Sequence, residues 1–358
     1  MSYFILGNSI GIAIRPGFEK KWGNMDLIDT ARLSTESEFH KMSYKLTVGY
    51  LKEFDYNECM NSGEIWYNEN KFIDKELGVC VTKINDSEFM IGANRACPEW
   101  FFVMCEMMLL KSGCTWIHGA ALEKNDGAIL MPARGGVGKT ATVVNMVRKH
   151  GWRLLGDDLE ILDSNNNSVH PFLKHFYIYG YHKNLFPELF ENNREKKPIS
   201  NQYISKMVSK MIPTVKGVLK KYPTLLETAR KLNPQSIKVS PKKIFDKEQL
   251  SDGAKYIEKV IWLERVKKRD INYFECTPEN VASRAAAITL TELTYGKMNM
   301  NLHLWAMCCS EILNYNEIYP KIYEIILNCI KDAKTGILEI PEEVSVDELS
   351  EIVYQHVD

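Results

Sequence analysis

The 358-residue sequence has almost no net charge and no long apolar segment. Its 45 Lys and Arg residues against 46 Asp and Glu residues give a formal charge of −1, which excludes a chain that is basic throughout, as a nucleic-acid coat would be. The longest apolar run, Trp100 to Leu110, is interrupted by Glu106 and is shorter than the roughly 20 residues that span a bilayer. No basic residue precedes the apolar start Phe4-Ile5-Leu6 and no cleavage site follows it, so no secretory signal is indicated.

Paired cysteines are also missing from this chain. The nine cysteines are an odd number, they are scattered, and none belongs to a Cys-x-x-Cys pair. This pattern is typical of reduced thiols in a cytosolic protein, most of them small core residues. We therefore expect a cytoplasmic protein with no membrane association. Internal repeats and low-complexity tails are absent from the sequence as well.

The first part of the chain, residues 1–97, predicts a small β-rich N-terminal domain. Ile10 to Ile14 alternates small and branched residues, and Gly78 to Thr82 and Glu88 to Ile91 are again strand-like. Asn85-Asp86-Ser87 is a turn signal between the last two strands.

The remainder, residues 98–358, predicts an α/β nucleotide-binding domain, because a strand, a glycine-rich loop, a helix and a further strand follow one another. Pro98 and Gly113 bracket a buried helix, and Asn125-Asp126-Gly127 predicts a hairpin turn. The expected strands cover 115–122, 128–132, 152–155, 259–263 and 337–340. The expected helices cover 100–111, a stretch from the loop to 150, then 278–290, 301–314, 317–333 and 345–356.

A basic segment interrupts this domain at 191–247. It contains fourteen basic and four acidic residues, and five prolines divide it into short helices. We interpret it as an insertion that is either a solvated helical face or a lid or docking surface for an acidic partner. No aromatic-rich recognition pattern accompanies the lysines, so nucleic acid ranks low among the partners.

The residues that carry chemistry begin with Ala133 to Thr140, which fit the phosphate-loop pattern with Ala133 in the place of a first glycine. Glycines let the backbone N–H groups wrap a phosphate chain, and the following helix points its first amides at the same anion. Lys139 supplies a charge to the β- and γ-phosphates, and the Thr140 hydroxyl ligates Mg²⁺. The predicted nucleotide-binding residues are Arg134, Gly135, Gly136, Val137, Gly138, Lys139, Thr140 and Ala141. A chance glycine-rich turn is the alternative, and Arg134 is either a phosphate ligand or solvated.

Two carboxylates, Asp157 and Asp158, close the next strand, and Asp158 lies 18 residues after Thr140. That spacing predicts a strand that returns beside the loop strand. One carboxylate can complete a Mg²⁺ shell, and the other, with its pKa raised by its neighbour, can accept a hydroxyl proton. A solvated Asp-Asp turn is the alternative. His118 lies in the strand before the hairpin, where a lone histidine is more often a core residue than a catalyst.

Together these pieces resemble one family, the HPr kinases. His118-Gly119, the loop ending Gly138-Lys139-Thr140, and the run Gly151 to Asp158 look closer still to the HPr-kinase-like enzymes of peptide natural-product gene clusters, which phosphorylate a serine hydroxyl of a precursor peptide. The resemblance covers roughly residues 98–170, with weaker echoes at 169–171 and 259–264. It implies the P-loop kinase fold shared with phosphoenolpyruvate carboxykinases.

The resemblance also implies a role for each residue. Asp157 is the base for the acceptor hydroxyl, Asp158 and Thr140 hold Mg²⁺, Lys139 holds the phosphates, and His118 hydrogen-bonds the catalytic carboxylate. The sequence departs from the HPr kinases after the Asp pair, where residues 171–176 replace their second signature, a Glu with an Arg-Gly run. HPr itself is therefore not indicated as the substrate.

The function predicted from the sequence is an ATP- and Mg²⁺-dependent kinase that acts on a hydroxyl of a peptide, protein or small molecule, with an acceptor that can be anionic. A regulatory ATPase without a phosphoacceptor is the alternative, and a carboxykinase-like lyase would need an arginine and a metal-ligand set that we cannot assemble. His170, His175 and His182 are interpreted as surface or packing histidines, and Arg284 as a helix-surface arginine. Homo-oligomers remain open.

Overall fold

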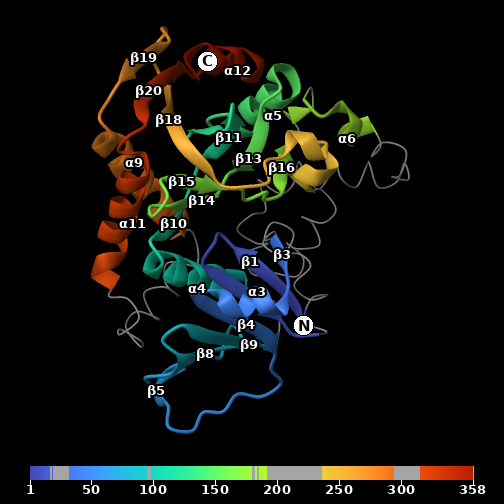
Figure 1. Cartoon of the computed structure of the whole chain (residues 1–358), viewed down its shortest axis with the longest axis vertical. Coiled ribbons are helices and arrows are strands. Elements are labelled where there is room, and N and C mark those ends of the chain that lie inside the picture. The colour runs from blue at the N-terminus through green and yellow to red at the C-terminus, as the bar shows by residue number, and fades with distance from the viewer. Residues whose placement is uncertain are drawn as a thin grey trace, which may run out of the picture. The chain divides into compact units, whose positions relative to one another are not determined.

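Two large β-sheets organise the structure, a computed structural model that describes residues 1–16, 18, 32–94, 98–179, 182–183, 185–191, 236–293 and 315–357. The fold is mixed α/β, as the sequence predicts (Figure 1). Two compact units are distinguished: Met1–Lys174 with Phe245–Asp358, and His175–Ile244. The helix expected over 301–314 and residues 192–235, most of the basic insertion, lie outside the described residues.

The N-terminal sheet belongs to the first unit. Its strand order is β3-β1-β2-β4-β9-β8-β7-β6-β5, with β2, β4 and β9 parallel to one another. The strands are β1 (Ser2–Leu6), β2 (Ile10–Ile14), β3 (Arg32–Ser34), β4 (Tyr44–Tyr50), β5 (Met60–Ser62), β6 (Ile65–Tyr67), β7 (Lys71–Asp74), β8 (Val79–Asn85) and β9 (Glu88–Ala93). A short helix, α3 (Glu36–Lys41), begins with a Thr35–Glu38 capping box. The β-rich character expected for this part of the chain is confirmed.

Helix α4 (Pro98–Lys111) joins the two sheets through one apolar core. It ends as predicted at Gly113, whose φ of 78° favours glycine. Trp100 near its start packs against Phe72 of the N-terminal sheet, with ring centroids 4.6 Å apart and the ring planes tilted by 47°. Glu106, the one charge in its apolar run, is buried and accepts hydrogen bonds from the Thr115 hydroxyl and the Trp116 N–H. The N-terminal sheet and helix α4 therefore belong to the same compact unit as the glycine-rich loop.

The second sheet carries the glycine-rich loop. Its main order is β10-β14-β15-β18-β12-β11-β13, and β18 also pairs with β20, which pairs with β19. The strands are β10 (Cys114–Ile117), β11 (Ala120–Lys124), β12 (Gly127–Leu130), β13 (Arg153–Asp157), β14 (Glu160–Asp163), β15 (Ser168–His170), β18 (Lys255–Val266), β19 (Asn272–Glu275) and β20 (Lys334–Pro341). Strands β12, β18 and β20 are parallel, so their carboxyl ends meet at one edge of the sheet.

Two expectations about this sheet are wrong. The strand predicted over 115–122 is split at His118-Gly119, because β10 pairs with β14 while β11 pairs with β12 and β13. Gly119 allows the break, since a Cβ there would lie 3.1 Å from the Met131 carbonyl oxygen. The strand that ends in the Asp pair also does not return beside the loop strand: β11 lies between β12 and β13.

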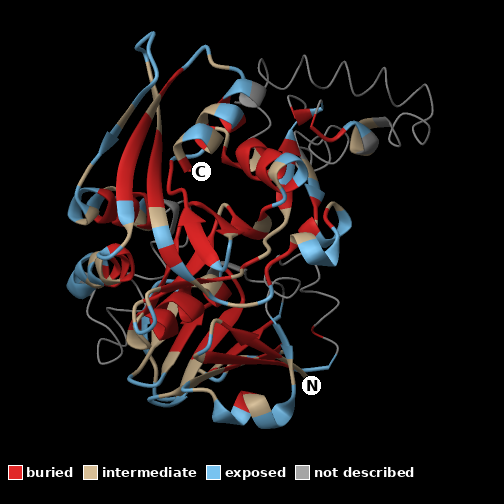
Figure 2. Ribbon diagram, turned by 45° about the horizontal axis from the view of Figure 1, so that its top comes forward, coloured by how far each residue is buried: buried red, intermediate tan, exposed pale blue. Residues whose placement is uncertain are grey.

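Helices cover both faces of the second sheet. On β18, Trp262 faces Arg284 of α9 (Pro278–Leu293), while the Lys259 ammonium donates to the His356 carbonyl of α12 (Val346–Val357) on the other face. Helix α5 (Lys139–His150) packs with α12, and α11 (Tyr315–Ile330) with α9. The intervening strands are buried, whereas β19 is largely exposed (Figure 2). Among the described residues, no helix is both long and apolar enough to cross a membrane.

The second unit contains the described ends of the basic insertion. Strands β16 (Phe176–Tyr179) and β17 (Ser236–Val239) form an antiparallel pair, accompanied by α6 (Pro187–Glu191) and a 3₁₀ turn, η2 (Pro241–Lys243). A further 3₁₀ turn, η3 (Lys247–Gln249), lies in the first unit. The second unit, His175–Ile244, begins 16 residues before the expected insertion of 191–247 and ends three residues before its expected end.

Candidate functional site

The glycine-rich loop 133–140 leaves β12 and leads into α5. Gly138 occupies the N-cap of α5 with a φ of 110°, and a Cβ there would lie 2.5 Å from Leu349 Cδ2. Only glycine satisfies both conditions. No side chain caps the helix, so its first amides are not occupied by a capping oxygen. Arg134, Gly135 and Gly136 are exposed, whereas Ala141 is buried beneath them.

Lys139 is buried and folds back over this loop. Its Nζ donates to the carbonyls of Ala133 (3.0 Å) and Arg134 (3.1 Å) and lies 3.2 Å from His118 Nε2. An ammonium is only a donor, so His118 Nε2 accepts and the ring is neutral with its proton on Nδ1. Burial, and then the Lys139 charge, lower the pKa of His118 to about 4. The backbone N–H of His118 is held by the Thr289 hydroxyl of α9.

Thr140 connects the loop to the Asp pair. Its hydroxyl donates to Asp157 Oδ2 at 2.6 Å, although β11 lies between the loop strand β12 and the strand β13 that ends in Asp157. Helix α5 packs over β11 and β13, and this crossing brings its first turn toward the end of β13. Asp157 is 5% exposed, and its Oδ1 is buried without a hydrogen-bond partner. Burial raises the pKa of Asp157 to about 6, against the opposing effect of Thr140.

Asp158 has a different environment from its neighbour. Its side chain is 41% exposed, Oδ1 lies 3.6 Å from His118 Nδ1, and Oδ2 lies 2.5 Å from Lys174 Nζ. Burial alone would raise the pKa of Asp158, but the positive charge of Lys174 beside it brings that pKa below its ordinary value. Asp158 also has a φ of 80°, a conformation that is uncommon outside glycine and that concentrates at functional sites.

These contacts exchange two pairings that the sequence analysis expects. Thr140 is paired with Asp157 rather than with Asp158, and His118 is beside Asp158 rather than bonded to Asp157. The structure brings the predicted site residues together at one edge of the second sheet. They come from the turn between β10 and β11, from the loop and first turn of α5, and from the end of β13. Within the described ranges, no group of three His, Cys, Asp or Glu side chains is arranged to hold a metal ion.

Three further residues of this region were not identified from the sequence. Glu160 is fully buried with both carboxylate oxygens unpartnered, and burial together with the two aspartates raises its pKa well above the ordinary value. Arg265 of β18 donates from Nε to the Val137 carbonyl of the loop. Lys174 holds Asp158. For Glu160 the sequence offered one signal, because it is a third acid close after Asp157 and Asp158. No local pattern points to Lys174 or Arg265, since the strand order of the folded sheet brings them near the loop and the Asp pair.

No family model matches this sequence, and no curated protein matches it significantly. The resemblance to HPr kinases therefore depends on the motif residues alone. Their arrangement is what the function must be argued from.

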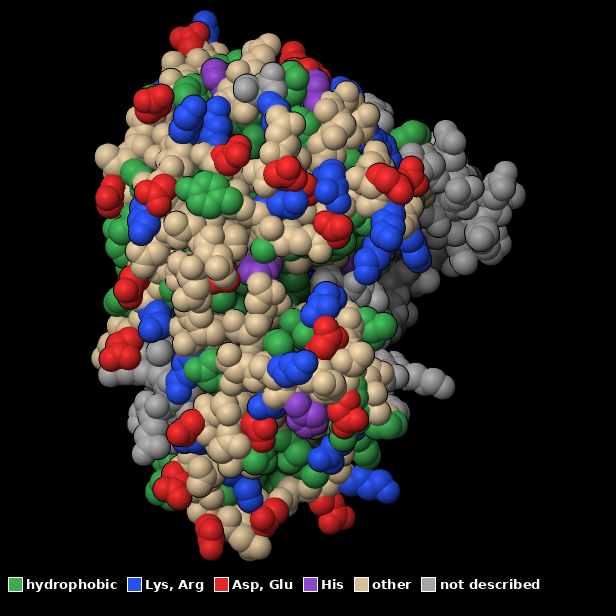
Figure 3. Space-filling view, in the orientation of Figure 1, with side chains coloured by type: hydrophobic (Ala, Val, Ile, Leu, Met, Phe, Trp, Pro, Cys, Tyr) green, Lys and Arg blue, Asp and Glu red, His purple; other side chains and the backbone are tan. Residues whose placement is uncertain are grey.

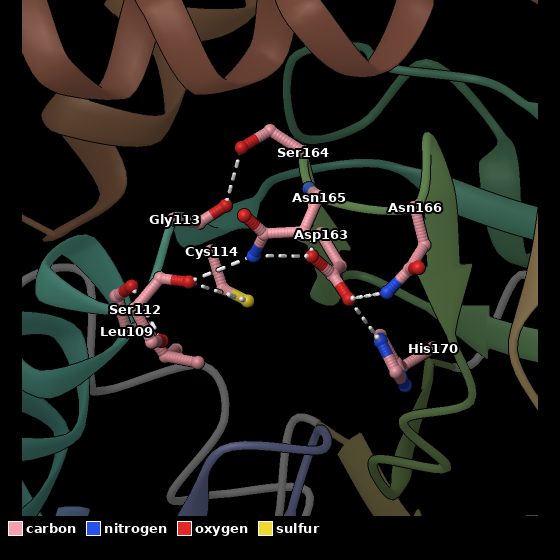
Figure 4. Close-up of polar contacts among 9 residues, drawn as sticks. All are labelled: Leu109, Ser112, Gly113, Cys114, Asp163, Ser164, Asn165, Asn166 and His170. Atoms are coloured by element: carbon pink, nitrogen blue, oxygen red, sulfur yellow. Dashed lines mark hydrogen bonds and ion pairs between the residues drawn. The ribbon is translucent and has the colours of Figure 1, made fainter. Parts of the chain in front are cut away.

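The remaining candidates from the sequence have packing contacts. His170 Nε2 lies 3.5 Å from Asp163 Oδ2, in a turn where Asn166 also donates to that oxygen (Figure 4). Burial would raise the pKa of Asp163, but these hydrogen bonds outweigh that effect and lower the pKa to about 2. His182 is buried in the second unit and accepts from the Tyr179 N–H. Arg284 is a partly exposed helix residue that donates to Glu264, as expected.

Proposed function

We propose that this chain is an ATP- and Mg²⁺-dependent kinase that transfers the γ-phosphate to a hydroxyl, and that its second sheet is a P-loop kinase core of the HPr kinase and phosphoenolpyruvate carboxykinase type. One observation carries the proposal: the Thr140 hydroxyl lies 2.6 Å from Asp157 Oδ2. That contact joins a phosphate-loop hydroxyl to a strand-end carboxylate, and Asp158 follows directly. A chance glycine-rich turn has no reason to meet an acid pair in this way.

The loop offers the groups that a triphosphate requires. The uncapped N-terminus of α5 presents backbone amides to an anion. Lys139 is held by two loop carbonyls and by His118, and an arriving phosphate is a stronger partner for an ammonium than a neutral carbonyl is. Nucleotide binding would therefore redirect Lys139 toward the β- and γ-phosphates.

The donor set next to the loop fits Mg²⁺. Thr140 Oγ1 and the unpartnered Asp157 Oδ1 are oxygen ligands, and the ordinary Mg²⁺ site in such enzymes uses one or two protein oxygens together with phosphates and water. Thr140 and Asp157 would hold the ion. A bound Mg²⁺ neutralises charge on the phosphates.

The remaining carboxylate then faces the acceptor. Asp158 is partly exposed, Lys174 holds its Oδ2, and Nδ1 of the neutral His118 lies 3.6 Å from its Oδ1. This arrangement favours Asp158 over Asp157 as the residue that contacts the acceptor hydroxyl. With a lowered pKa it acts mainly by accepting a hydrogen bond that orients the hydroxyl, as phosphoryl transfer through a loose transition state requires.

The transfer balances on these groups. The acceptor oxygen forms a bond to the γ-phosphorus, the bond from that phosphorus to the β,γ-bridging oxygen breaks, and ADP leaves with the electron pair. The acceptor proton passes to Asp158. Lys174, which is paired with Asp158, would stabilise the negative oxygens of the transferred phosphoryl group if its ammonium moved from Asp158 to them. Lys and Arg side chains are interspersed with Asp and Glu on the face that Figure 3 shows, so this view favours no strongly charged acceptor.

The test compares Lys139→Met with Lys149→Met, a matched change to a half-exposed lysine of the same helix. Titration calorimetry with Mg²⁺ and a non-hydrolysable ATP analogue should show binding lost in Lys139→Met and kept in Lys149→Met. Labelled γ-phosphate should pass to one of a set of hydroxyl acceptors, including serine peptides, sugars and amino acids. Binding that is equal in both variants would reject the nucleotide site. Hydrolysis with no labelled acceptor would instead favour the regulatory ATPase.

A further inference from the structure

The glycine-rich loop and the Asp pair together give the bound triphosphate a direction. At the carboxyl edge of the second sheet the strands follow one another as β13, β11, β12, β18 and β20. The loop leaves β12, and the Asp pair lies to one side of it, at the end of β13. The reacting γ-phosphate must face Asp157 and Asp158, so the nucleoside end must extend to the other side, toward β18 and β20.

A hollow lies at that end of β18 and β20, which we call the nucleoside pocket. It has a volume of about 440 Å³. Its walls come from the segment between β18 and β19, from the end of β20 and the residues that follow it, and from the first turn of α12. Figure 1 shows these elements near the carboxyl end of the chain. The lining residues are Arg269, Ile271, Pro341, Glu343, Val344 and Glu348.

Arg265 fastens this pocket to the loop. Its Nε donates to the Val137 carbonyl at 3.2 Å, while Nη1 donates to the carbonyls of Pro341 (2.7 Å) and Val344 (3.0 Å). One guanidinium therefore spans the back of the phosphate loop and two residues of the pocket wall. Leu349 of α12 approaches Gly138 from the same side. The loop and the pocket are consequently held in a fixed relation on one rigid support.

The pocket walls suit an uncharged, flat group with hydrogen-bond donors. Ile271 is 41% exposed, and with Val344 and Pro341 it offers apolar contact to a ring. Glu343 takes part in no hydrogen bond or ion pair among the described residues, and Glu348 uses only Oε2, to cap Ser345. Carboxylates accept from amino and hydroxyl groups, and two of them would repel a phosphate. The Arg269 guanidinium can stack on a ring.

We infer that the nucleoside pocket binds the purine nucleoside of the nucleotide whose phosphates occupy the glycine-rich loop. This inference rests on the proposed function and adds to it where the base and ribose lie. The base would contact the apolar wall, and its exocyclic groups or the ribose hydroxyls would donate to Glu343 and Glu348. The shared chemistry is that of a purine nucleoside, and ATP and GTP are separate arms of the test.

The test uses the full chain and separates the nucleoside from the phosphates. Affinities for ATP, GTP and inorganic tripolyphosphate, each with Mg²⁺, are measured for the wild type, Ile271→Glu and Glu343→Gln. The control is Ile84→Glu, a change to an exposed isoleucine of the N-terminal sheet. Ile271→Glu should weaken the preferred purine nucleotide by about tenfold or more, and Glu343→Gln by about three- to tenfold, the scale of one hydrogen bond. Neither should alter the affinity for tripolyphosphate, which also shows that each variant is folded.

The outcomes separate the two proposals. If the wild type binds tripolyphosphate and a purine nucleotide and the pocket variants bind both as the wild type does, the nucleoside pocket is rejected while the phosphate site stands. The same holds if the variants lose both ligands equally relative to Ile84→Glu. A wild type that binds neither ligand overturns the proposed function, and the nucleoside pocket with it.

Discussion

The Lys139 ammonium lies 3.2 Å from Nε2 of His118, so a single lysine contacts both the glycine-rich loop and the histidine beside Asp158. The same ammonium cannot serve His118 and a phosphate chain equally. If the proposed nucleotide site is correct, a phosphate chain would draw Lys139 away, so that His118 Nε2 would lose a positive neighbour while Nδ1 keeps its carboxylate. Nucleotide binding would then raise the pKa of His118, the residue beside Asp158.

The pKa of His118 is expected to rise when Lys139 is removed. It is lowered to about 4, first by burial and then by Lys139, so Lys139→Met should move it upward while burial keeps it below the ordinary value. An NMR titration of the histidine ring nitrogens would measure this, with His118→Asn identifying the signal. A His118 pKa unchanged by Lys139→Met would contradict the described contact.

The two aspartates should respond differently to amide substitution. Asp158→Asn should keep Mg²⁺-dependent nucleotide binding and lose roughly 10²–10⁴-fold in phosphoryl transfer, the usual scale for a positioned proton acceptor. Asp157→Asn should weaken Mg²⁺-dependent binding and turnover together, because it removes the oxygen that would hold the ion. Binding and transfer are measured side by side. The opposite pattern would restore the roles that the sequence resemblance implies.

Asp157→Asn should also stabilise the chain when neither nucleotide nor metal is present. Burial raises the folded-state pKa of Asp157 from 3.8 to about 6, so the folded protein binds this proton more tightly than the unfolded chain. The free energy of unfolding therefore falls as pH rises from about 4 to about 6 and stays lower above that. The gain from Asp157→Asn at pH 7 is on the order of 2–3 kcal/mol.

Denaturant unfolding at pH 4 and pH 7 with a chelator present would measure this gain, which should disappear at the lower pH. Thr140 can still donate to the amide oxygen, so the variant keeps the hydrogen bond seen here. A variant that is less stable than the wild type at pH 7 would show that the charge of Asp157 is not the destabilising feature.

Glu106 should be replaceable by glutamine but not by leucine. Burial raises the pKa of Glu106 to about 8, so its side chain is already mostly neutral at pH 7. A glutamine amide can accept from the backbone N–H of Trp116 while donating to the hydroxyl oxygen of Thr115. Glu106→Leu leaves that N–H buried and unpaired, which costs about 1–3 kcal/mol. Unfolding measurements on both variants test this. Equal stability of Glu106→Leu and Glu106→Gln would mean that the Trp116 N–H finds another partner.

Local sequence patterns predicted the elements that carry many of the site residues. They did not predict the order of the strands in the second sheet. The glycines of the loop, the cap at Gly113 and the acids after Leu155 each have a local signature, so the elements that carry Lys139 and Asp157 were predicted. The position of β11 between β12 and β13 was not, because strand order depends on which apolar faces pack together. The different contacts of Asp157 and Asp158 accompany a positive φ at Asp158, and hydrophobic periodicity carries no information on that backbone angle.

Helix α4 also determines how the chain can be shortened. It is apolar on all sides, and its residues from Trp100 to Leu110 are buried except for Phe102, which is partly buried. A fragment that begins at Pro98 would keep this helix and lose the N-terminal sheet that packs against it, exposing Trp100 and its neighbours to water. Such a fragment would tend to aggregate rather than fold as an autonomous domain. Neither sheet is expected to melt before the other, because unfolding either one uncovers the same helix.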